Sequence, residues 1–380
     1  MNWVKKLFLE FVAWRVFLFV PLILSYPLIK IRQGFEYTTS LHYILLHSFL
    51  SNFLLYPWAN FDGVYYLTIA SAGYTVDNSG FFPLYPALIK VFSLNNSAFS
   101  PYQFFTGLIL SSLFIFFGII AFYKLLRMDF NKKTAFLAVS ALLFFPTSFY
   151  LASIYPESLF FMLLIMSFYF ARKGNWLLSG VCGILLTATR IVGIAIFPAL
   201  LFEFYVQNKE LFSKKIIPVF LSPVGLVSYF FYDYLNFGNF FQFAKAQGGL
   251  HNNRSVGEIV LFPQTLYRYF KIITSLNHSQ YEWWIAILEL LAFIFAALMM
   301  YIAWKKKVRI SYLIFALIAF LIPTQTGTFT GLPRYVLVLF PIFIAVALIK
   351  NKYIKIIYVL VSIVLLIILF ILFSKGYYVA

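Results

Sequence analysis

The chain carries the stretch Trp58-Ala-Asn-Phe-Asp62-Gly-Val-Tyr-Tyr-Leu-Thr-Ile-Ala-Ser-Ala-Gly73-Tyr74, followed by Phe81-Phe-Pro-Leu-Tyr-Pro86. It holds one carboxylate, Asp62, among aromatic side chains, and Gly, Pro, Asn and Ser interrupt it too often for it to cross a bilayer. Most of the remaining chain is apolar enough to do so. A carboxylate beside this much hydrocarbon is either a local structural device or a functional group, and the rest of the sequence bears on that choice.

The composition is that of an integral, multi-pass membrane protein. Of the 380 residues, 63% are hydrophobic and 11% are charged, whereas about a quarter of the residues of a soluble domain are charged. No internal repeat or low-complexity tail is visible, so residues 1–380 are expected to form a single domain. The N-terminus resembles a signal sequence, but Arg15 interrupts its apolar run and no small-x-small cleavage site follows. This pattern predicts an uncleaved first span.

The net charge of +17 would suit a nucleic-acid-binding protein, but its distribution argues against one. Of the 29 Lys and Arg, 18 fall in short loops between apolar spans, which is the positive-inside pattern of membrane proteins and also favours contact with anionic lipids. These residues are Lys5, Lys6, Lys124, Arg127, Lys132, Lys133, Arg172, Lys173, Lys209, Lys214, Lys215, Lys305, Lys306, Lys307, Arg309, Lys350, Lys352 and Lys355. We therefore expect membrane lipids, and no nucleic acid, among the partners.

The apolar stretches predict an all-α fold of about eleven transmembrane helices with the N-terminus inside. The expected spans are 7–29, 102–123, 134–153, 157–171, 176–189, 191–206, 216–235, 283–304, 310–324, 335–349 and 356–373. Two long outer segments follow from them, 30–100 with the opening stretch and 236–281. Residues 41–57 are apolar but contain two His, two Ser and an Asn, which favours an interfacial or half-inserted helix. A further crossing there would move the basic loops outside.

This topology brings most of the unusual polar residues to one face, the outer one. They are Asp62, Asp77, Glu157, Arg190, Gln247, His251, Arg254, His278 and Arg334. Arg190 stands out because an arginine at membrane depth is costly unless it is paired or faces water. It either snorkels or closes a helix end, or it binds a phosphate, for which a planar guanidinium is well suited. Arg334 is either an ordinary basic residue flanking a span or a second ligand of the phosphate, while Glu157 either caps the helix that it begins or binds a ligand.

Asp62 also has two readings. Asn60 and Asp62 could cap an amphipathic helix over 63–72, or Asp62-Gly63 could form a turn. Alternatively, Asp62 is a general base, because a carboxylate at a water–lipid boundary lies within reach of a substrate hydroxyl. In a helix, Tyr65 and Tyr66 fall three and four residues on, so a tyrosine face would lie over the carboxylate.

Other kinds of site find no support in the sequence. There is no His-x-x-His or Glu-x-x-His motif, and Cys182 is the single cysteine, so no dedicated metal site is expected, although a divalent ion held jointly with a ligand stays open. There is no P-loop and no Gly-x-Gly-x-x-Gly motif, so no nucleotide site and no cofactor are expected.

Several segments together resemble a known family. They are Trp58-x3-Asp62-x2-Tyr65-Tyr66-x2-Ile69-Ala70-x2-Gly73-Tyr74 with Phe81–Pro86, Tyr155-Pro-Glu157-Ser158, Thr189-Arg190-x2-Gly193, Phe237-Gly238-Asn-Phe-x4-Lys245-Ala246-Gln247 and Gly331-Leu-Pro-Arg334-Tyr335. This pattern resembles the GPI second-mannose mannosyltransferases and their prokaryotic relatives, within the C-type glycosyltransferase superfamily. Trp and Asp are adjacent in many members, whereas Ala-Asn-Phe separates them here.

The resemblance implies a mannosyltransferase that takes a sugar from a polyprenyl-phosphate donor and transfers it, with inversion, to an acceptor hydroxyl. Asp62 would be the catalytic base, and Arg190 and Arg334 would bind the donor phosphate. The remaining substrate contacts would come from Trp58, Tyr65, Tyr66, Tyr85, Glu157, Gln247, Arg254 and Tyr335. The acceptor would be a glycan, lipid or protein at the extracytoplasmic face of a prokaryotic plasma membrane, or at the lumenal face of the endoplasmic reticulum of a eukaryote.

Two other functions are compatible with the sequence. A transporter or flippase of lipid-linked sugars would use charges at membrane depth, for which Glu10, Glu203, Asp233 and Glu289 are the candidates. Another lipid-linked transferase, such as an O-antigen polymerase or ligase, would share the outer arginines but would not need the stretch from Trp58 to Pro86.

Overall fold

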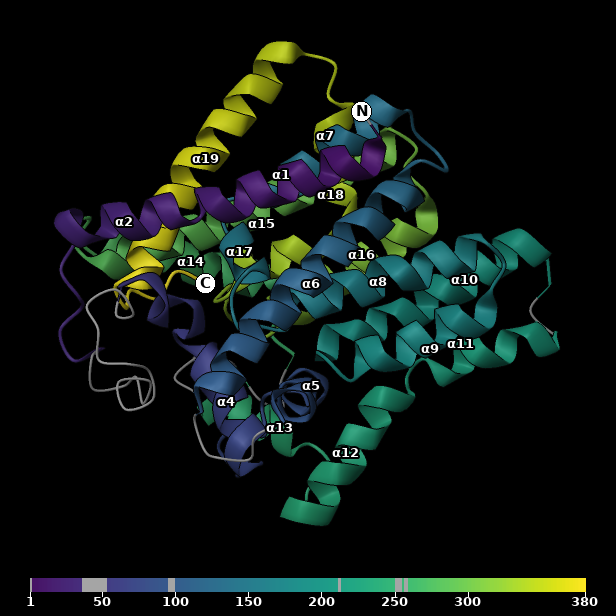
Figure 1. Ribbon diagram of the computed structural model, residues 1–380, viewed down its shortest axis with the longest axis horizontal. Helices are drawn as coiled ribbons and strands as arrows, with labels where there is room; N and C mark the ends of the chain where they lie inside the picture. Colours follow the sequence, from purple (N-terminus) through teal and green to yellow (C-terminus); the bar gives the residue numbers. More distant parts are fainter. Residues whose placement is uncertain (1, 36–52, 95–99, 211–212, 250–254, 256–258) are drawn as a thin grey trace.

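The computed structural model describes residues 2–35, 53–94, 100–210, 213–249, 255 and 259–380 (Figure 1). Regular structure in these ranges is helical, apart from one isolated bridge between Val260 and Thr326. The prediction of an all-α fold is confirmed for this part of the chain. Most of the 41–57 segment, and with it the question of an interfacial helix, lies outside the described residues.

The described α-helices are, in chain order, α1 (Trp3–Phe17), α2 (Phe19–Leu28), α4 (Asp62–Ala72), α5 (Leu84–Ser93), α6 (Pro101–Leu126), α7 (Lys132–Leu143), α8 (Glu157–Arg172), α9 (Trp176–Thr187), α10 (Ile196–Asn208), α11 (Ile217–Leu221), α12 (Val224–Phe237), α13 (Gln242–Gly249), α14 (Phe262–Ser275), α15 (Tyr281–Lys305), α16 (Ile310–Thr324), α17 (Leu332–Tyr335), α18 (Pro341–Leu348) and α19 (Lys352–Ser374). Short 3-10 turns join them: η3 (Tyr56–Ala59), η4 (Ser148–Leu151), η5 (Ile191–Ala195), η6 (Lys214–Ile216) and η7 (Val336–Val338).

Every predicted span falls on helical residues, but only some of them are long single helices. Five helical stretches of the described chain are long and apolar enough to cross a membrane: Trp3–Leu28, Pro101–Leu126, Ile191–Asn208, Tyr281–Lys305 and Lys352–Ser374. A sixth would be Lys214–Leu221 with Val224–Phe237, which is bent by 42°. The count of about eleven spans stays a prediction.

Three of the expected spans are broken at prolines. The stretch at 134–153 divides into α7 and η4 around Pro146, and the one at 216–235 bends at Pro223, which precedes α12. The stretch at 335–349 contains the last residue of α17, then η7 and α18, and Pro341 begins α18. Proline cannot donate the backbone hydrogen bond that a continuous helix needs, and it restricts the residue before it.

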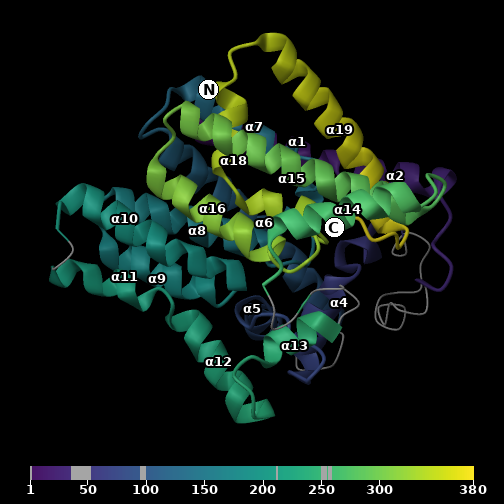
Figure 2. The same cartoon turned by 180° about the vertical axis from the view of Figure 1, so that it is seen from behind.

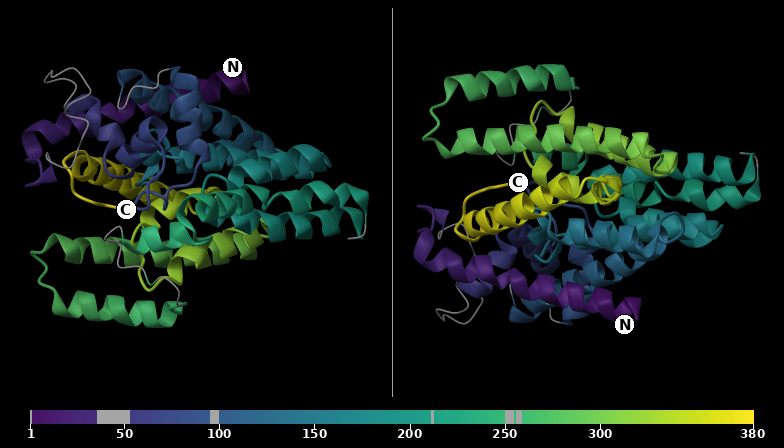
Figure 3. Two further views of the ribbon diagram at one scale, coloured as in Figure 1. Left: turned by 90° about the horizontal axis from the view of Figure 1, so that it is seen from below. Right: turned by 90° about the horizontal axis from the view of Figure 1, so that it is seen from above.

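The helices form one packed bundle. Helix α8 packs between α6 and α9, α18 packs against α7 and α15, α10 against α16, and α19 against α2. Helices α1 and α6 face the viewer in Figure 1, and the view from behind brings α14 and α15 to the front (Figure 2). Figure 3 shows α14 and α15 side by side as an antiparallel pair, joined by one turn. Helix α12 lies against α9 at Gly225, where a Cβ would come within 2.0 Å of the Ile184 carbonyl oxygen.

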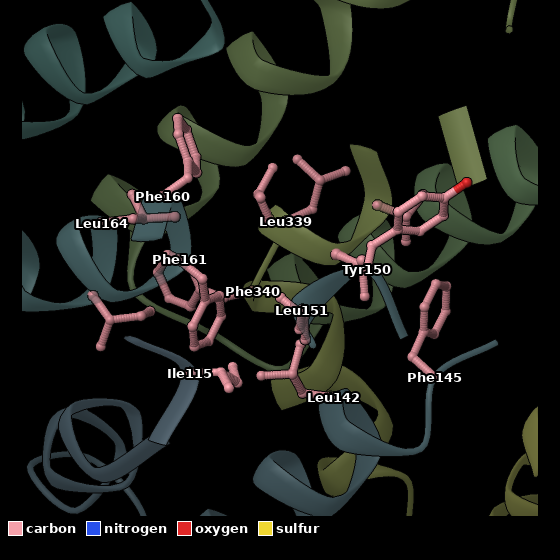
Figure 4. Close-up of a cluster of buried hydrophobic side chains, with 14 of the residues drawn as sticks. Ile115, Leu142, Phe145, Tyr150, Leu151, Phe160, Phe161, Leu164, Leu339 and Phe340 are labelled. Atoms are coloured by element: carbon pink, nitrogen blue, oxygen red, sulfur yellow. The ribbon is translucent and has the colours of Figure 1, made fainter. Parts of the chain in front are cut away.

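The centre of the bundle is an aromatic and aliphatic core drawn from helices far apart in sequence (Figure 4). Phe161 packs edge-on against Phe122, and Phe340 contacts both Phe122 and Phe168. Removing a buried phenylalanine side chain from such a core costs about 3–5 kcal/mol. This core holds the ends of the helices in fixed relative positions, which the site below requires.

The two ends of the bundle differ in character. Helix α8 begins at Glu157 and ends at Arg172, and 16 residues of helix separate these positions by about 22 Å. At the Arg172 end, Arg172 donates to Asp129 at 2.6 Å, and Arg309 donates to Glu203 at 2.6 Å. We call this end the basic end, because Lys6, Lys124, Lys132, Arg172 and Arg309 lie at or near the helix ends there. The other end contains the candidate site.

Candidate active site

The five segments that carry the family resemblance meet around one cavity of about 580 Å³ at the Glu157 end of α8. Its lining residues are Arg32, Phe61, Asp62, Tyr65, Tyr66, Gly80, Phe81, Phe82, Glu157, Thr189, Arg190, Ile191, Phe243, Gln247, Thr330, Arg334, Tyr335 and Tyr378. Eight of the residues predicted from the sequence are therefore brought together, although 272 positions separate Asp62 from Arg334 along the chain. They are Asp62, Tyr65, Tyr66, Glu157, Arg190, Gln247, Arg334 and Tyr335.

The backbone before Asp62 holds this carboxylate at the start of α4. Phe61 has φ 58° and ψ −116°, a conformation that costs a non-glycine residue energy, and such strain often occurs at functional sites. Its ring packs between Phe35 and Phe373, which keeps the backbone in place. Gly63 follows, and a Cβ there would lie 3.3 Å from the Ile154 carbonyl oxygen. A glycine at this position therefore lets α4 begin directly against the segment before Glu157.

Tyr155 joins these two segments. Its hydroxyl donates to the Asn60 carbonyl oxygen at 2.6 Å and accepts from the Asp62 backbone N–H at 3.1 Å. The Asn60 side chain donates to the Phe373 carbonyl oxygen at 2.9 Å, so the end of α19 is tied to the same loop. These bonds fix the Asp62 backbone from both sides.

A chain of charges crosses the floor of the cavity. The Arg334 Nη1 atom lies 2.6 Å from Asp62 Oδ2, and the Arg190 Nη1 atom lies 2.5 Å from Glu157 Oε1. The Arg334 Nε atom lies 3.3 Å from the same Glu157 oxygen. The Glu157 side chain is 1% exposed and that of Asp62 is 24% exposed. Glu157 is thus a buried link between the two arginines, whereas Asp62 remains partly open.

This geometry bears on the alternative roles of these residues. Asp62 and Glu157 lie in the first turns of α4 and α8, whose N-caps are Phe61 and Pro156, so each carboxylate is favoured by the helix dipole and also faces an arginine. Arg190 does not snorkel to an exposed position, because it is buried, pairs with Glu157 and lies over the ring of Tyr335, 4.6 Å from its centroid. All three charged side chains, Asp62, Glu157 and Arg190, line the cavity.

The charges also set the protonation of their neighbours. Burial would lower the pKa of the Arg334 guanidinium, but the charges of Asp62 and Glu157 outweigh burial and hold that pKa well above its ordinary value. Burial, together with the charges of Glu157 and Asp62, raises the pKa of Tyr66 well above its ordinary value. At neutral pH the cavity therefore offers a cationic guanidinium and a protonated phenol as hydrogen-bond donors.

Aromatic side chains form one wall of the cavity. Tyr65 stacks on Phe81 with ring centroids 4.7 Å apart, and it is 37% exposed, so its free face is available to a ligand. The Gln247 side chain donates to the Gly80 carbonyl oxygen at 2.8 Å and fastens α13 to this wall. Flat rings beside charged groups are the surfaces on which sugars stack.

Other predicted site residues lie elsewhere. Trp58 and Tyr85 are buried behind the cavity and are not among its lining residues; Trp58 donates to the Leu54 carbonyl oxygen, and the Tyr85 hydroxyl bonds with Ser111. These hydrogen bonds and their burial place both side chains in the aromatic interior of the bundle. Asp77 is exposed outside the lining. His278 lies in the α14–α15 turn, while His251 and Arg254 lie outside the described residues.

The sequence reasoning missed Arg32, Thr330 and Tyr378, which also line the cavity. Arg32 is a cation in the segment 30–100, which has few basic residues, and Thr330 belongs to the run Thr324-Gln-Thr-Gly-Thr-Phe-Thr330, so both had a signal in the sequence. Tyr378 had none, because it reaches the cavity only through the packing of α19. In the ranges that the structure describes, no three His, Cys, Asp or Glu side chains gather closely enough to hold a metal ion.

The four acids that a transporter would use do not share a pathway. Each has its own partner: Ser140 donates to Glu10, Arg309 to Glu203, the Phe243 backbone N–H to Asp233, and Tyr269 to Glu289. Glu10 and Glu203 are near the basic end, whereas Glu289 borders the other end. These positions favour structural roles for the four carboxylates over a continuous translocation route.

Comparison with known proteins gives a weak structural likeness. No family model matches the chain, and no curated protein matches it. Among solved structures, the chain is similar to the oligosaccharyltransferase of Archaeoglobus fulgidus tethered with an acceptor peptide, with 12% identity, a TM-score of 0.45 and coverage of 99% of this chain and 56% of that chain. The apo form of the same protein gives 13% identity, a TM-score of 0.47 and coverage of 100% and 57%. The chain thus spans little more than half the length of these structures, and TM-scores below 0.5 are too low to assign its activity.

Proposed function

We propose that the chain is a membrane glycosyltransferase that moves a sugar, mannose by the family resemblance, from a polyprenyl-phosphate donor to an acceptor hydroxyl. One observation carries the proposal: all five segments of the resemblance line a single cavity that contains a partly exposed carboxylate, Asp62, beside the two buried arginines Arg190 and Arg334. A resemblance that arose by chance would have no reason to converge in space.

The proposed reaction is a displacement at the anomeric carbon. The acceptor oxygen forms a bond to this carbon as the bond to the phosphate oxygen breaks, and the configuration inverts. Asp62 takes the proton of the acceptor hydroxyl, and the lipid phosphate leaves with the bonding electrons. Arg334 and Arg190 stabilise the negative charge of the leaving phosphate. Because the donor is already activated, the reaction needs no nucleotide and no further cofactor.

Arg334 has two tasks in this scheme. In the structure its Nη1 atom lies 2.6 Å from Asp62 Oδ2, and this contact orients the carboxylate. When the donor enters, its phosphate is a second anion within reach of the same guanidinium, which has several N–H groups to share. The Glu157 carboxylate holds Arg190, and approaches Arg334, from the buried side, so the arginines present their other N–H groups to the cavity.

A second cavity of about 380 Å³ provides room for the lipid part of the donor. It adjoins the first, because Arg32, Thr330 and Tyr378 line both. Its other walls are mostly apolar, with Ile272 from α14, Leu276 just after α14, and Ile285 and Ala286 from α15 among them. We assign the prenyl chain to this cavity and Arg32 to the phosphate at the junction.

The proposed orientation places the active site at the extracytoplasmic or lumenal face and the basic end inside, with about eleven spans. Tags at residues 130 and 260 should then report opposite sides of the membrane. Tags on the same side would contradict this topology.

The activity itself is tested with the full-length protein in lipid nanodiscs. We expect transfer of radiolabelled mannose from polyprenyl-phosphate mannose to a membrane or glycan acceptor fraction, with the anomeric configuration of the product inverted relative to the donor. The same donor bearing glucose serves as the comparison for the sugar. No transfer from any polyprenyl-phosphate sugar, or transfer with retained configuration, would contradict the proposal. ATP-driven or gradient-driven movement of an intact lipid-linked sugar would instead favour the flippase.

A further inference from the structure

Two hollows open at the basic end of the bundle, on the far side of the molecule from the candidate active site. One, of about 490 Å³, is lined by Lys6, Glu10, Lys132, Lys133, Phe136, Leu137 and Ser140. The other, of about 450 Å³, is lined by Trp3, Tyr123, Lys124, Arg127, Met128, Lys132, Tyr169 and Lys173. Lys132 borders both, so the two hollows lie next to each other. We call them together the basic groove.

The basic groove carries far more positive than negative charge. Six cations and one carboxylate line it: Lys6, Lys124, Arg127, Lys132, Lys133, Lys173 and Glu10. Nearby acids are occupied elsewhere, since Asp129 pairs with Arg172 and Glu203 pairs with Arg309. Within the described part of the chain, no ion pair joins any of the six cations to a carboxylate. The groove is therefore complementary to an anion.

Aromatic and apolar groups surround these cations. Trp3 and Tyr123 stack with centroids 5.1 Å apart, and Lys124 lies over the Trp3 ring. Lys6 lies over Phe136, 4.2 Å from its centroid. The following turns of α1 leave Phe8 and Leu9 about half exposed. Tryptophan and tyrosine prefer the headgroup level of a bilayer, and the exposed side of α1 continues into hydrocarbon, so the expected anion carries acyl chains.

We propose that the basic groove binds the phosphate headgroup of an anionic membrane lipid. The lysines contact the phosphate, the Trp3–Tyr123 pair lies at headgroup level, and the acyl chains run along the exposed face of α1. The positive-inside rule explains why basic residues occur at this end at all, but it requires neither a hollow nor a shared lysine between two hollows. The groove is independent of the proposed sugar transfer and stands on its own geometry.

The chain offers a matched pair of variants for the test. The groove variant is K124Q/K132Q/K133Q, and the control variant is K305Q/K306Q/K307Q, which removes the same charge from another basic loop that does not line the groove. Full-length protein in neutral detergent is titrated with phosphatidylglycerol or phosphatidylcholine, and bound lipid is counted by native mass spectrometry. Each lysine near a headgroup contributes about fivefold in affinity, so the groove variant should bind phosphatidylglycerol about 100-fold more weakly than wild type.

The expected pattern is a preference for phosphatidylglycerol in the wild type and in the control variant, and its loss in the groove variant. Equal losses in both triple variants would overturn the proposal, because the basic face as a whole would then suffice. Absence of any preference over phosphatidylcholine would also overturn it. Competition by inorganic pyrophosphate at concentrations as low as the lipid's would assign the groove to a soluble anion and refute the lipid. If the triple variant does not fold, K132Q alone should weaken binding about fivefold, since Lys132 borders both hollows.

Discussion

Replacing Glu157 with alanine would remove a buried carboxylate that approaches both arginines of the candidate site. Glu157 is 1% exposed, accepts from Arg190 at 2.5 Å and lies 3.3 Å from the Arg334 Nε atom. Its loss would leave Arg190 buried without its ion-pair partner, and removing one member of a buried pair costs about 3–5 kcal/mol. We expect the apparent melting temperature of E157A, measured by intrinsic fluorescence in detergent, to fall by on the order of 10 °C.

The control for this prediction is an ion pair at the other end of the same helix. Asp129 pairs with Arg172 at 2.6 Å, but its side chain is 28% exposed, and an exposed pair contributes about 1 kcal/mol or less. D129A should therefore lower the melting temperature by only a few degrees. The double variant E157A/R190A should be more stable than the sum of its single variants predicts, since it removes the unpaired charge together with its partner. Equal effects of E157A and D129A would refute the view of Glu157 as a buried link.

Three further predictions follow from the geometry. The charges of Asp62 and Glu157 raise the pKa of Arg334 above the already high pKa that arginine has in the unfolded chain, so the stability that Arg334 contributes is present throughout the range below that unfolded pKa. The melting temperature of R334A should therefore lie below that of the wild type by the same amount at pH 6 and at pH 9. A smaller difference at pH 9 would contradict this. G63V should reduce the yield of folded protein or its melting temperature, because the added atoms meet Ala59 and the Ile154 carbonyl oxygen. G249V is the control and should change neither, because no atom of the described residues lies within 4 Å of a Cβ at Gly249. R32Q should raise the KM for the polyprenyl-phosphate donor by about tenfold with little change in melting temperature, since a hydrogen bond to a charged group contributes about 1.5–3 kcal/mol; an unchanged KM would remove Arg32 from the phosphate site.

Local sequence signals predicted the elements well. The helix expected over 63–72 is α4, and the stretch expected at 310–324 is α16 with the same bounds. Such segments are defined by their own apolar pattern and end signals. The broken spans show the limit of this reading, since composition alone does not reveal that Pro146 or Pro223 interrupts a helix until the backbone hydrogen bonds are traced.

The sequence predicted eight of the residues that line the cavity, but not the ion pairs that they form with one another. The motifs identified Asp62, Glu157 and Arg334, yet nothing in the sequence indicates that Arg334 contacts Asp62, 272 positions away, and approaches Glu157 as well. The sequence left the partners of Arg190 and Arg334 open, and the structure gives each a carboxylate partner. Pairing of this kind depends on how the helices pack, as does the arrival of Tyr378 from the end of the chain. Trp58 and Tyr85 belong to the motif but do not line the cavity; they are buried in the hydrophobic core next to it.

The central claim is that Asp62 is the base of a sugar transfer, and the D62N variant tests it most directly. D62N keeps the size of the side chain but removes the proton acceptor, while D77N removes an exposed carboxylate 15 positions further along the chain, outside the cavity. With radiolabelled polyprenyl-phosphate mannose, equal amounts of folded protein and saturating donor, we expect D62N to lose transfer by at least about 100-fold, in line with the contribution of a general base, and D77N to retain it. Full activity in D62N would contradict the account.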